Sequence, residues 1–494
     1  MTRHLMWGVL VLVLLAMSPW ASGQEAGKNV PGEAAAQKPR QLAIANKPWT
    51  GDFDKLVKRR MIRVLVPYSR TLFFNDKGTE RGLTAELVRD FERYINQKLK
   101  TTKRPITIYL IPTTRDRLLP DLNGGLGDIA AGNLTITEER LKVVDFALAG
   151  IRDHVTEVVV TGPKSPAIST VEDLAGKTVH VRTSSSYYES LVSLNERLGR
   201  ERKAAIKLVL VPDALEDEDM MEMLNAGLFE AIVVDDWKSK MWAQILPEIK
   251  VNDGATLRKQ GQIGWAVRKG SPQLKEAIED FDRNFVEKQG VDDYRLKQYM
   301  KRIRQIKDPT GTAEWQRFDQ TLALFEKYGS KYNFDPLMLA AQGYQESQLN
   351  QEARSHVGAI GVMQVMPETG KDMRVGDITI TEHNVHAGAK YMDLLMRKHF
   401  PDAKFSEGNR PLFAFASYNA GAGNISRMRK EAVRRGLDPD KWFNNVELVV
   451  AEKIGQETTT YVRNIYKYYV AYKLTLAAQE AQRKAREQVA PESK

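Results

Sequence analysis

The sequence of 494 residues contains no cysteine. This absence excludes disulfide bonds, thiolate catalysis, cysteine-ligated metal sites and a lipid anchor attached through cysteine. Histidine is scarce as well, and the spacing of His356, His383 and His386 matches no metal-site pattern. We therefore predict that the protein uses neither a metal nor another cofactor.

Long hydrophobic runs are missing beyond the N-terminus. The apolar run at residues 5–17 is too short to span a bilayer comfortably. It follows Arg3 and His4 and precedes small residues that end at Gly23, a layout typical of a secretory signal peptide. We expect residues 1–23 to be this signal peptide, with an uncleaved anchor as the alternative.

A concentrated basic region is the third feature that the sequence lacks. The 73 Lys and Arg residues outnumber the 63 Asp and Glu residues, which gives a formal net charge of +10, but they form no long block. A nucleic-acid-binding groove is therefore not indicated. The excess charge suits contact with an anionic polymer or a membrane surface, and general solubility explains it equally well.

The length favours two or three domains, and the sequence pattern changes along the chain. Residues 24–57 are expected to form a flexible leader. Residues 58–300 alternate strand-like and helical patterns, which predicts an α/β domain with open, mostly parallel sheets. The expected strands are residues 61–67, 106–111, 157–160, 178–181, 207–211, 230–234 and 264–268, and the expected helices include residues 83–99 and 274–299.

One motif in this domain, from Gly127 to Phe146, resembles the signature of type-3 extracellular solute-binding proteins. The resemblance implies a two-lobed, periplasmic-binding-protein-like fold that binds an amino acid. It also implies that Arg140 clamps the ligand carboxylate, that Ser185 lies in a hydroxyl-bearing turn, and that Asp235 receives the ligand ammonium group. A guanidinium is well suited to bidentate contact with a carboxylate.

Two of these residues also have simpler interpretations. Arg140 could be a solvated charge at a helix end, and Asp235 could cap the helix that follows its strand. The family usually shows an aromatic residue near positions 147–150, where this chain has Ala-Leu-Ala-Gly. We therefore expect either a different ligand preference or weak binding.

The second half of the chain is predicted to be helical. Residues 301–312 are expected to be a linker because charge, Pro309 and Gly311 occur together. Residues 313–476 show helical periodicity without convincing strands, which predicts an all-α domain. The polar residues 477–494 are expected to form a frayed or disordered tail.

Glu346 is the candidate catalytic residue of this helical domain. A helix is expected to begin at Asp335-Pro336, with aspartate as its N-cap, and to place Glu346 in its last turn or just beyond. The partial negative charge of the helix C-terminus and apolar neighbours both disfavour the carboxylate. We therefore predict a raised pKa, which suits a general acid, although a lone glutamate near a helix end is usually a surface residue.

Four short blocks, in order along the chain, make a catalytic role for Glu346 the stronger interpretation. The blocks are Glu346-Ser347, Gly358-Ala359 with residues 361–367, residues 416–421, and residues 457–462. Together they resemble the lytic transglycosylase domain of the soluble-lytic-transglycosylase type, which implies an α-helical, goose-lysozyme-like fold. One departure is Gln351, where the family usually has proline.

The resemblance implies that Glu346 acts twice on peptidoglycan glycan strands. As an acid it protonates the glycosidic oxygen between N-acetylmuramic acid and N-acetylglucosamine. As a carboxylate it then deprotonates the muramic acid C6 hydroxyl, which attacks C1 and closes a 1,6-anhydro ring without water. Further residues are expected to bind substrate: Ser355, Met363, Gln364, Met366, Tyr418, Asn419, Glu457 and Tyr461. Core packing is the alternative for Met363, Met366 and Tyr461.

The pairing of the two domains resembles membrane-bound lytic murein transglycosylases. It implies a periplasmic enzyme with peripheral outer-membrane contact, and it suggests that an amino acid or muropeptide bound near Arg140 regulates cleavage. Two other functions stay open. A hydrolytic lysozyme or chitinase would leave ordinary reducing ends, and a wall-sensing binding protein would carry an inactive catalytic domain.

Overall fold

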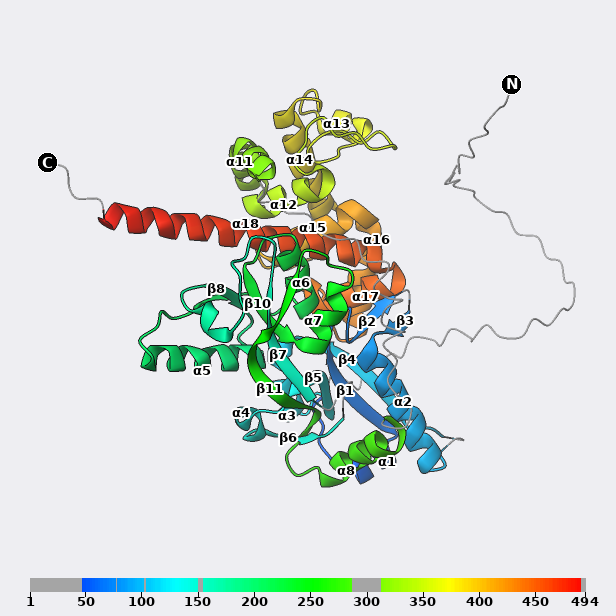
Figure 1. Ribbon diagram of the computed structural model, residues 1–494. Coiled ribbons are helices and arrows are strands. Elements are labelled where there is room, and N and C mark those ends of the chain that lie inside the picture. Colours follow the sequence, from blue (N-terminus) through cyan, green and yellow to red (C-terminus); the bar gives the residue numbers. More distant parts are fainter. Residues whose placement is uncertain (1–46, 77, 102–103, 150–153, 287–311, 490–494) are drawn as a thin grey trace, which may run out of the picture. The chain divides into compact units, whose positions relative to one another are not determined.

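The computed structural model describes residues 47–76, 78–101, 104–149, 154–286 and 312–489 (Figure 1). These residues belong to one compact unit of the chain, residues 39–494. The predicted signal peptide and residues 301–311 of the predicted linker lie outside the described residues.

The α/β domain contains two sheets that share one long strand, β11. In the first lobe the strand order is β4-β1-β5-β11, with β6 also paired to β11. Helices α2 and α8 pack on this sheet through apolar faces that include Phe91 and Phe281. The elements are α1 (Phe53–Arg59), β1 (Met61–Pro67), α2 (Leu83–Lys98), β4 (Thr107–Thr113), α3 (Arg115–Asn123), β5 (Ile129–Thr135), α4 (Glu138–Leu141), β6 (Val144–Ala147) and α8 (Pro272–Phe281).

The second lobe continues from β11 in the order β7-β10-β8-β9. Its elements are β7 (His154–Thr161), β8 (Thr178–Val181), α5 (Ser186–Arg200), β9 (Lys207–Leu210), α6 (Asp217–Asn225), β10 (Ala231–Asp235), α7 (Asp236–Ala243) and β11 (Lys250–Arg268). The predicted strands are present, but the sheets are mixed. Strands β7 and β11 run antiparallel to their neighbours, whereas β1, β4 and β5 pair in parallel, as do β8, β9 and β10.

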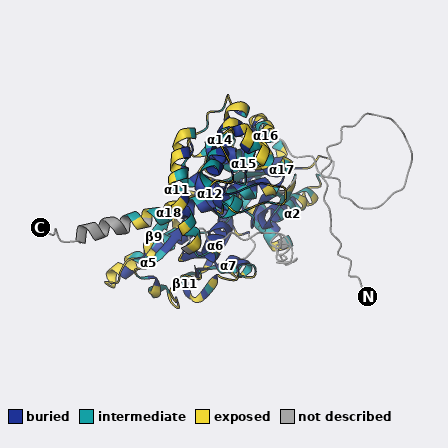
Figure 2. Cartoon of the chain, turned by 90° about the horizontal axis from the view of Figure 1, so that it is seen from above, coloured by how far each residue is buried: buried dark blue, intermediate teal, exposed yellow. Residues whose placement is uncertain are grey.

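The second domain is helical, as predicted. Its helices are α11 (Thr312–Tyr332), α12 (Pro336–Ser347), α13 (Pro367–Met373), α14 (Thr381–His399), α15 (Asn409–Ala420), α16 (Ala422–Arg434), α17 (Glu447–Lys453) and α18 (Gln456–Val489). Helices α12 and α15 are buried along most of their length, and Figure 2 shows them beneath the more exposed α14 and α16. Aromatic side chains pack between α11 and α18, where the rings of Phe318 and Tyr472 stack with their centroids 4.2 Å apart.

Two predicted boundaries need correction, and a third lies outside the described residues. The leader ends before residue 57, because Phe53 and Val57 of α1 already pack on the core of the first lobe. The helix predicted from residue 274 is present as α8 and continues as a π-helical segment over residues 282–286, and its predicted end lies outside the described residues. The polar tail is helical through Val489, because Ala, Glu, Gln, Lys and Arg favour a helix and no glycine or proline interrupts the run before Pro491.

A hairpin that sequence patterns did not indicate joins the two domains. It consists of β2 (Phe74–Asp76) and β3 (Thr79–Arg81), and β2 lies against α17. Gln456 at the start of α18 donates a hydrogen bond to the carbonyl of Asn75 at 3.1 Å. The hairpin therefore places the beginning of α18 against the α/β domain.

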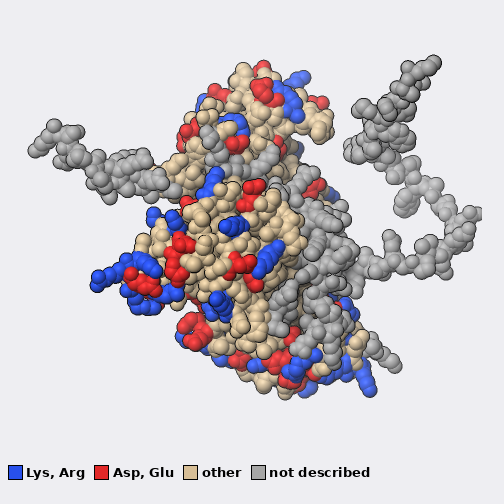
Figure 3. All heavy atoms as spheres, viewed as in Figure 1, with Lys and Arg blue, Asp and Glu red and all other residues tan. Residues whose placement is uncertain are grey.

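Surface charge is mixed on the face seen in Figure 3, where basic and acidic side chains alternate. The net positive charge does not gather into one basic patch on this face. Among the described residues, no helix is both long and apolar enough to cross a membrane.

Candidate active site

Helix α12 carries Glu346 as its penultimate residue. Asp335 caps the helix by accepting hydrogen bonds from the backbone N–H groups of Leu337 (2.8 Å) and Met338 (3.2 Å), and Pro336 occupies the first turn. The helix ends at Gln348, which adopts a left-handed conformation with φ of 57°. The local sequence thus fixes Glu346 in the last turn, as predicted.

Glu346 is half-buried and has one hydrogen-bonding neighbour that shapes its acidity. Burial raises the pKa of Glu346 to about 7, and the hydrogen bond donated by the Tyr461 hydroxyl only partly opposes this rise. Tyr461 carries no positive charge that would hold the carboxylate ionised. A substantial fraction of Glu346 is therefore protonated at neutral pH and able to donate a proton.

Two tyrosines and an amide surround this carboxyl group. The hydroxyl of Tyr418 donates to the carbonyl of Met363 at 2.8 Å. Burial, together with the charge of Glu346, raises the pKa values of both Tyr418 and Tyr461. Gln342, one turn before Glu346, has its Nε2 atom 3.5 Å from the Tyr461 hydroxyl. Helices α12, α15 and α18 thus each contribute a polar side chain near Glu346.

The loop between α12 and α13 is held by short-range hydrogen bonds. Ser355 closes a turn by accepting from the Ala359 backbone N–H at 2.9 Å. Gln364 has a positive φ of 45°, and its side chain donates to the carbonyls of Ala353 and Gly361. Glycine is required at position 361, because φ is 74° and an added Cβ would lie 2.5 Å from the Gln351 side chain.

Gln351 is a structural residue that sequence reasoning noted only as a departure. Its Nε2 atom donates to the carbonyls of Ile378 and Thr379, both at 3.0 Å. Its Oε1 atom accepts from the Val362 backbone N–H at 3.3 Å. The glutamine therefore ties the loop to the start of α14.

The predicted sugar-binding residues differ in their exposure. Met366 is 40% exposed and Asn419 is exposed, so both are accessible to a ligand. Met363 is fully buried and lies against Gly388, which favours core packing, the alternative given for this residue. Glu457 is exposed on α18, and Asn419 accepts a hydrogen bond from the neighbouring Thr458 at 2.8 Å.

The structure brings the predicted ligand-binding residues of the α/β domain close together. Arg140 donates to the carbonyls of Thr135 (2.9 Å) and Ser184 (3.2 Å), one from each lobe. The Ser185 hydroxyl accepts from the Tyr188 backbone N–H and caps α5. A pocket between the lobes is lined by Arg140 and Ser185, among others, but its volume is only about 20 Å³, room for about one water.

Asp235 lies beside this pocket and is buried. It accepts a hydrogen bond from Asn133 of the other lobe at 3.1 Å, and its second oxygen has no partner among the described residues. Burial raises the pKa of Asp235 to about 6, although Lys238 lowers it. The lobes are also joined by the ion pair between Arg115 and Glu216 at 2.8 Å, so an amino acid needs the lobes to separate before it can enter.

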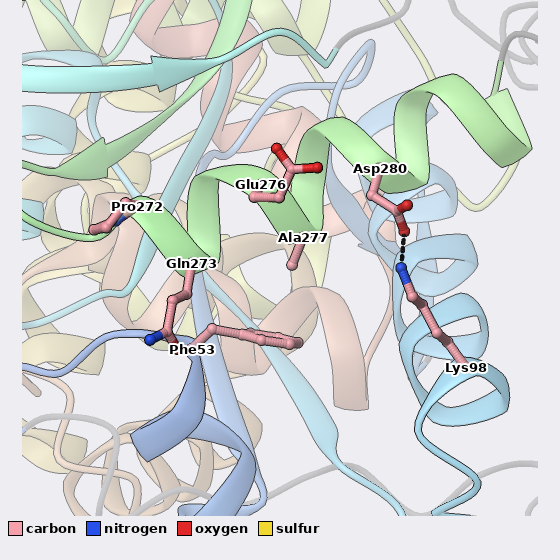
Figure 4. A pocket seen from close by; sticks show the side chains of 7 residues that line it. All are labelled: Phe53, Lys98, Pro272, Gln273, Glu276, Ala277 and Asp280. Atoms are coloured by element: carbon pink, nitrogen blue, oxygen red, sulfur yellow. Dashed lines mark hydrogen bonds and ion pairs between the residues drawn. The ribbon is translucent and has the colours of Figure 1, made fainter.

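A surface hollow of about 430 Å³ lies elsewhere, beside α1, α2 and α8 (Figure 4). Phe53 forms part of its floor, and the ion pair between Lys98 and Asp280 closes one end. It contains none of the predicted site residues. Among the described residues, no cluster of three histidine, aspartate or glutamate side chains is arranged to hold a metal ion.

Each of the two domains matches a family of known proteins. Residues 62–297 match the family of bacterial extracellular solute-binding proteins, family 3, and residues 323–440 match the transglycosylase SLT domain. The chain is 27% identical over 444 residues to membrane-bound lytic murein transglycosylase F of Desulfosudis oleivorans, covering 84% of this chain and 90% of that protein. It is 28% identical over 453 residues to the protein of that name from Pseudomonas fluorescens Pf-5, covering 86% of this chain and 87% of that protein.

Among solved structures, an ancestral arginine-binding protein bound to arginine matches 49% of this chain and 98% of its own length. The identity is 23% and the TM-score is 0.40.

Proposed function

Because the chain joins a family-3 solute-binding domain to a transglycosylase SLT domain, we propose that it is a peptidoglycan lytic transglycosylase. Its curated relatives carry the name of such enzymes, and the alignments run through both domains. The observation that carries the proposal is the half-buried Glu346, whose pKa of about 7 makes it both a competent acid and, after proton transfer, a competent base.

The reaction proposed for Glu346 has two steps. Its carboxyl proton moves to the glycosidic oxygen between N-acetylmuramic acid and N-acetylglucosamine as the C1–O bond breaks, with the N-acetyl group assisting at C1. The resulting carboxylate then removes the proton of the muramic acid C6 hydroxyl while O6 bonds to C1. The glutamate ends protonated as it began, and the product is a 1,6-anhydro ring.

The described partners of Glu346 include no second carboxylate, which is compatible with this reaction. Hydrolases of this kind usually need a second carboxylate, about 5–10 Å from the acid, as nucleophile or base. The groups identified around Glu346 are the tyrosines Tyr418 and Tyr461 and the amide Gln342. Glu457, expected from the sequence to bind substrate, is exposed and shares no described hydrogen bond with Glu346.

Sugar contacts are proposed for the accessible residues near this centre. Ser355 and Gln364 would bind from the loop before α13, and Met366 and Asn419 offer exposed surface. Tyr418 and Glu457 would complete the set from α15 and α18. In the α/β domain, Arg140, Ser185 and Asp235 would hold an amino acid or muropeptide after the lobes separate, and such a ligand would regulate cleavage.

The proposed location is the periplasm, with peripheral contact at the outer membrane and a role in cell-wall turnover. Two features support it: the signal-peptide pattern of residues 1–23 and relatives whose name describes them as membrane-bound. With no cysteine to accept lipid, contact would depend on the basic surface or on apolar side chains.

Mass spectrometry of digested peptidoglycan tests the proposed activity. Wild-type protein should release muropeptides with 1,6-anhydro ends, and Glu346→Gln should bind glycan strands but release none, because the amide has no acid proton to give. Reducing ends from the wild type would instead assign the protein to the hydrolases. No product from either protein would favour a binding protein.

A further inference from the structure

Helix α18 contacts α12 of its own domain on one face and α6 of the α/β domain on another. Tyr461 faces α12 and donates its hydrogen bond to Glu346. Arg463 and Lys467, one turn apart, contact α6 of the α/β domain. Since successive residues of a helix turn by about 100°, this pair lies roughly opposite Tyr461 on α18.

The contact with α6 is a buried network of charges. Asp219 pairs with Arg463 at 3.2 Å and with Lys467 at 3.1 Å, and Glu222 pairs with Lys467 as well. The side chains of Asp219, Glu222 and Lys467 are each 1–2% exposed. Arg70 completes the network from the first lobe, with distances of 3.3 Å to Asp219 and 2.8 Å to Glu222.

Further contacts fix the same segment of α18. Arg463 also donates to the carbonyl of Ala214 at 2.8 Å, just before α6, and to Glu447 of α17 at 2.8 Å. Buried pairs of this kind often add little net stability, but they require a defined geometry because each unpaired charge would be costly. They are therefore suited to setting the position of a helix.

We propose that Asp219 and Glu222 are positioning residues for glycan cleavage, because they hold the first turns of α18 so that the Tyr461 hydroxyl stays on Glu346. The α/β domain would thereby form part of the support of the catalytic centre, with or without a ligand between its lobes. This inference rests on the proposed transglycosylase function.

The test measures how the rate at which the full-length chain cleaves soluble, uncross-linked glycan strands depends on pH. Tyr461→Phe removes the hydrogen bond that stabilises the Glu346 carboxylate, so the alkaline limb of kcat should move to higher pH. Asp219→Asn with Glu222→Gln should move that limb in the same direction and lower kcat about tenfold. In the Tyr461→Phe background, the α6 substitutions should cause no additional shift.

A matched control separates positioning from general stability. Asp128→Asn removes a carboxylate that is equally buried and pairs with Arg63 at 3.0 Å, but it lies in the first lobe away from α18. It should lower the thermal midpoint and leave the pH profile unchanged. Glu222→Asp, which keeps the charge, serves as a milder variant if the double substitution does not fold.

The inference is overturned if the α6 variants cleave with the wild-type pH profile, or if their shift adds to that of Tyr461→Phe. Failure of the proposed function would look different, because wild-type protein would then release no anhydro products under any condition. The two failures can therefore be distinguished in one set of digests.

Discussion

Glu346 and Asp219 of α6 share one protein interior, but their pKa values shift in opposite directions. Burial disfavours the charged form in both places. At Glu346 the hydrogen-bonding neighbour is a neutral tyrosine, and the pKa rises to about 7. At Asp219 the cost of burial is more than offset by Lys467, Arg463 and Arg70, and the pKa falls well below its ordinary value.

The comparison teaches that charged partners can reverse the effect of burial, as they do at Asp219 and do not at Glu346. Asp217, at the start of α6, repeats the second pattern, because Arg182 and Lys238 outweigh burial and lower its pKa. Asp217 and Asp219, held between cations, keep their charge and fix structure. A carboxyl group among neutral neighbours can exchange its proton with a substrate.

The largest expected effect on activity comes from placing a cation beside Glu346, as lysine and arginine lie beside Asp219 of α6. Tyr461→Lys would place an ammonium group beside the carboxylate, and an adjacent cation typically lowers a carboxyl pKa by 1–3 units. At pH 7 cleavage should fall about 100-fold, and the optimum should move to acidic pH. A pH–rate profile measures both, with Tyr461→Phe as the control that removes the hydroxyl without adding charge. An unchanged optimum would contradict this account of Glu346.

The largest effect on stability is expected from the opposite change, removal of a cation at α6. Lys467→Met leaves Asp219 and Glu222 buried with one positive charge fewer, which should destabilise the protein by about 3–5 kcal/mol at pH 7. The loss should shrink as pH falls. The depressed pKa of Asp219 contributes stability that is present above its unfolded pKa, about 3.9, and disappears under acid.

Urea unfolding at pH 7 and at pH 3 measures this difference. Lys473→Met is the matched control, because Lys473 lies on the same helix but is exposed. It should change the free energy of unfolding by less than about 0.5 kcal/mol. Equal losses in the two variants would mean that the buried network contributes no specific stability.

The position of Glu346 could be predicted from the sequence better than the mixed sheets or the charge network at α6. Glu346 could be located because the Asp335-Pro336 start and the apolar helix are local signals, and the motifs around it are ordered along the chain. The mixed sheets could not be predicted, since the antiparallel pairing of β7 and β11 depends on partners far apart in sequence. The α6 network was missed for the same reason, because Asp219 and Lys467 are 248 residues apart and look like ordinary surface charges.

The smallest predicted effect concerns the stability cost of Glu346 itself. Its folded pKa of about 7 lies above the unfolded value near 4.3, so the folded state holds an extra proton between these pH values. The contribution of Glu346 to the free energy of unfolding is therefore most favourable below about pH 4 and falls as pH rises through 7. Glu346→Gln cannot ionise and should be more stable than wild type at pH 8 by about 1–2 kcal/mol, after allowance for partial exposure.

Urea unfolding of both proteins at pH 4 and pH 8 tests this prediction, and the gap should be present at pH 8 and absent at pH 4. Glu457→Gln provides the control, because Glu457 is exposed and its replacement should leave the pH dependence of stability unchanged. A gap of equal size at both pH values would mean that the glutamine packs better, independent of charge. A gap confined to pH 8 would show that burial of the ionisable Glu346 carboxyl group lowers the free energy of unfolding. The protein would then be less stable because of the same group whose proton the proposed reaction needs.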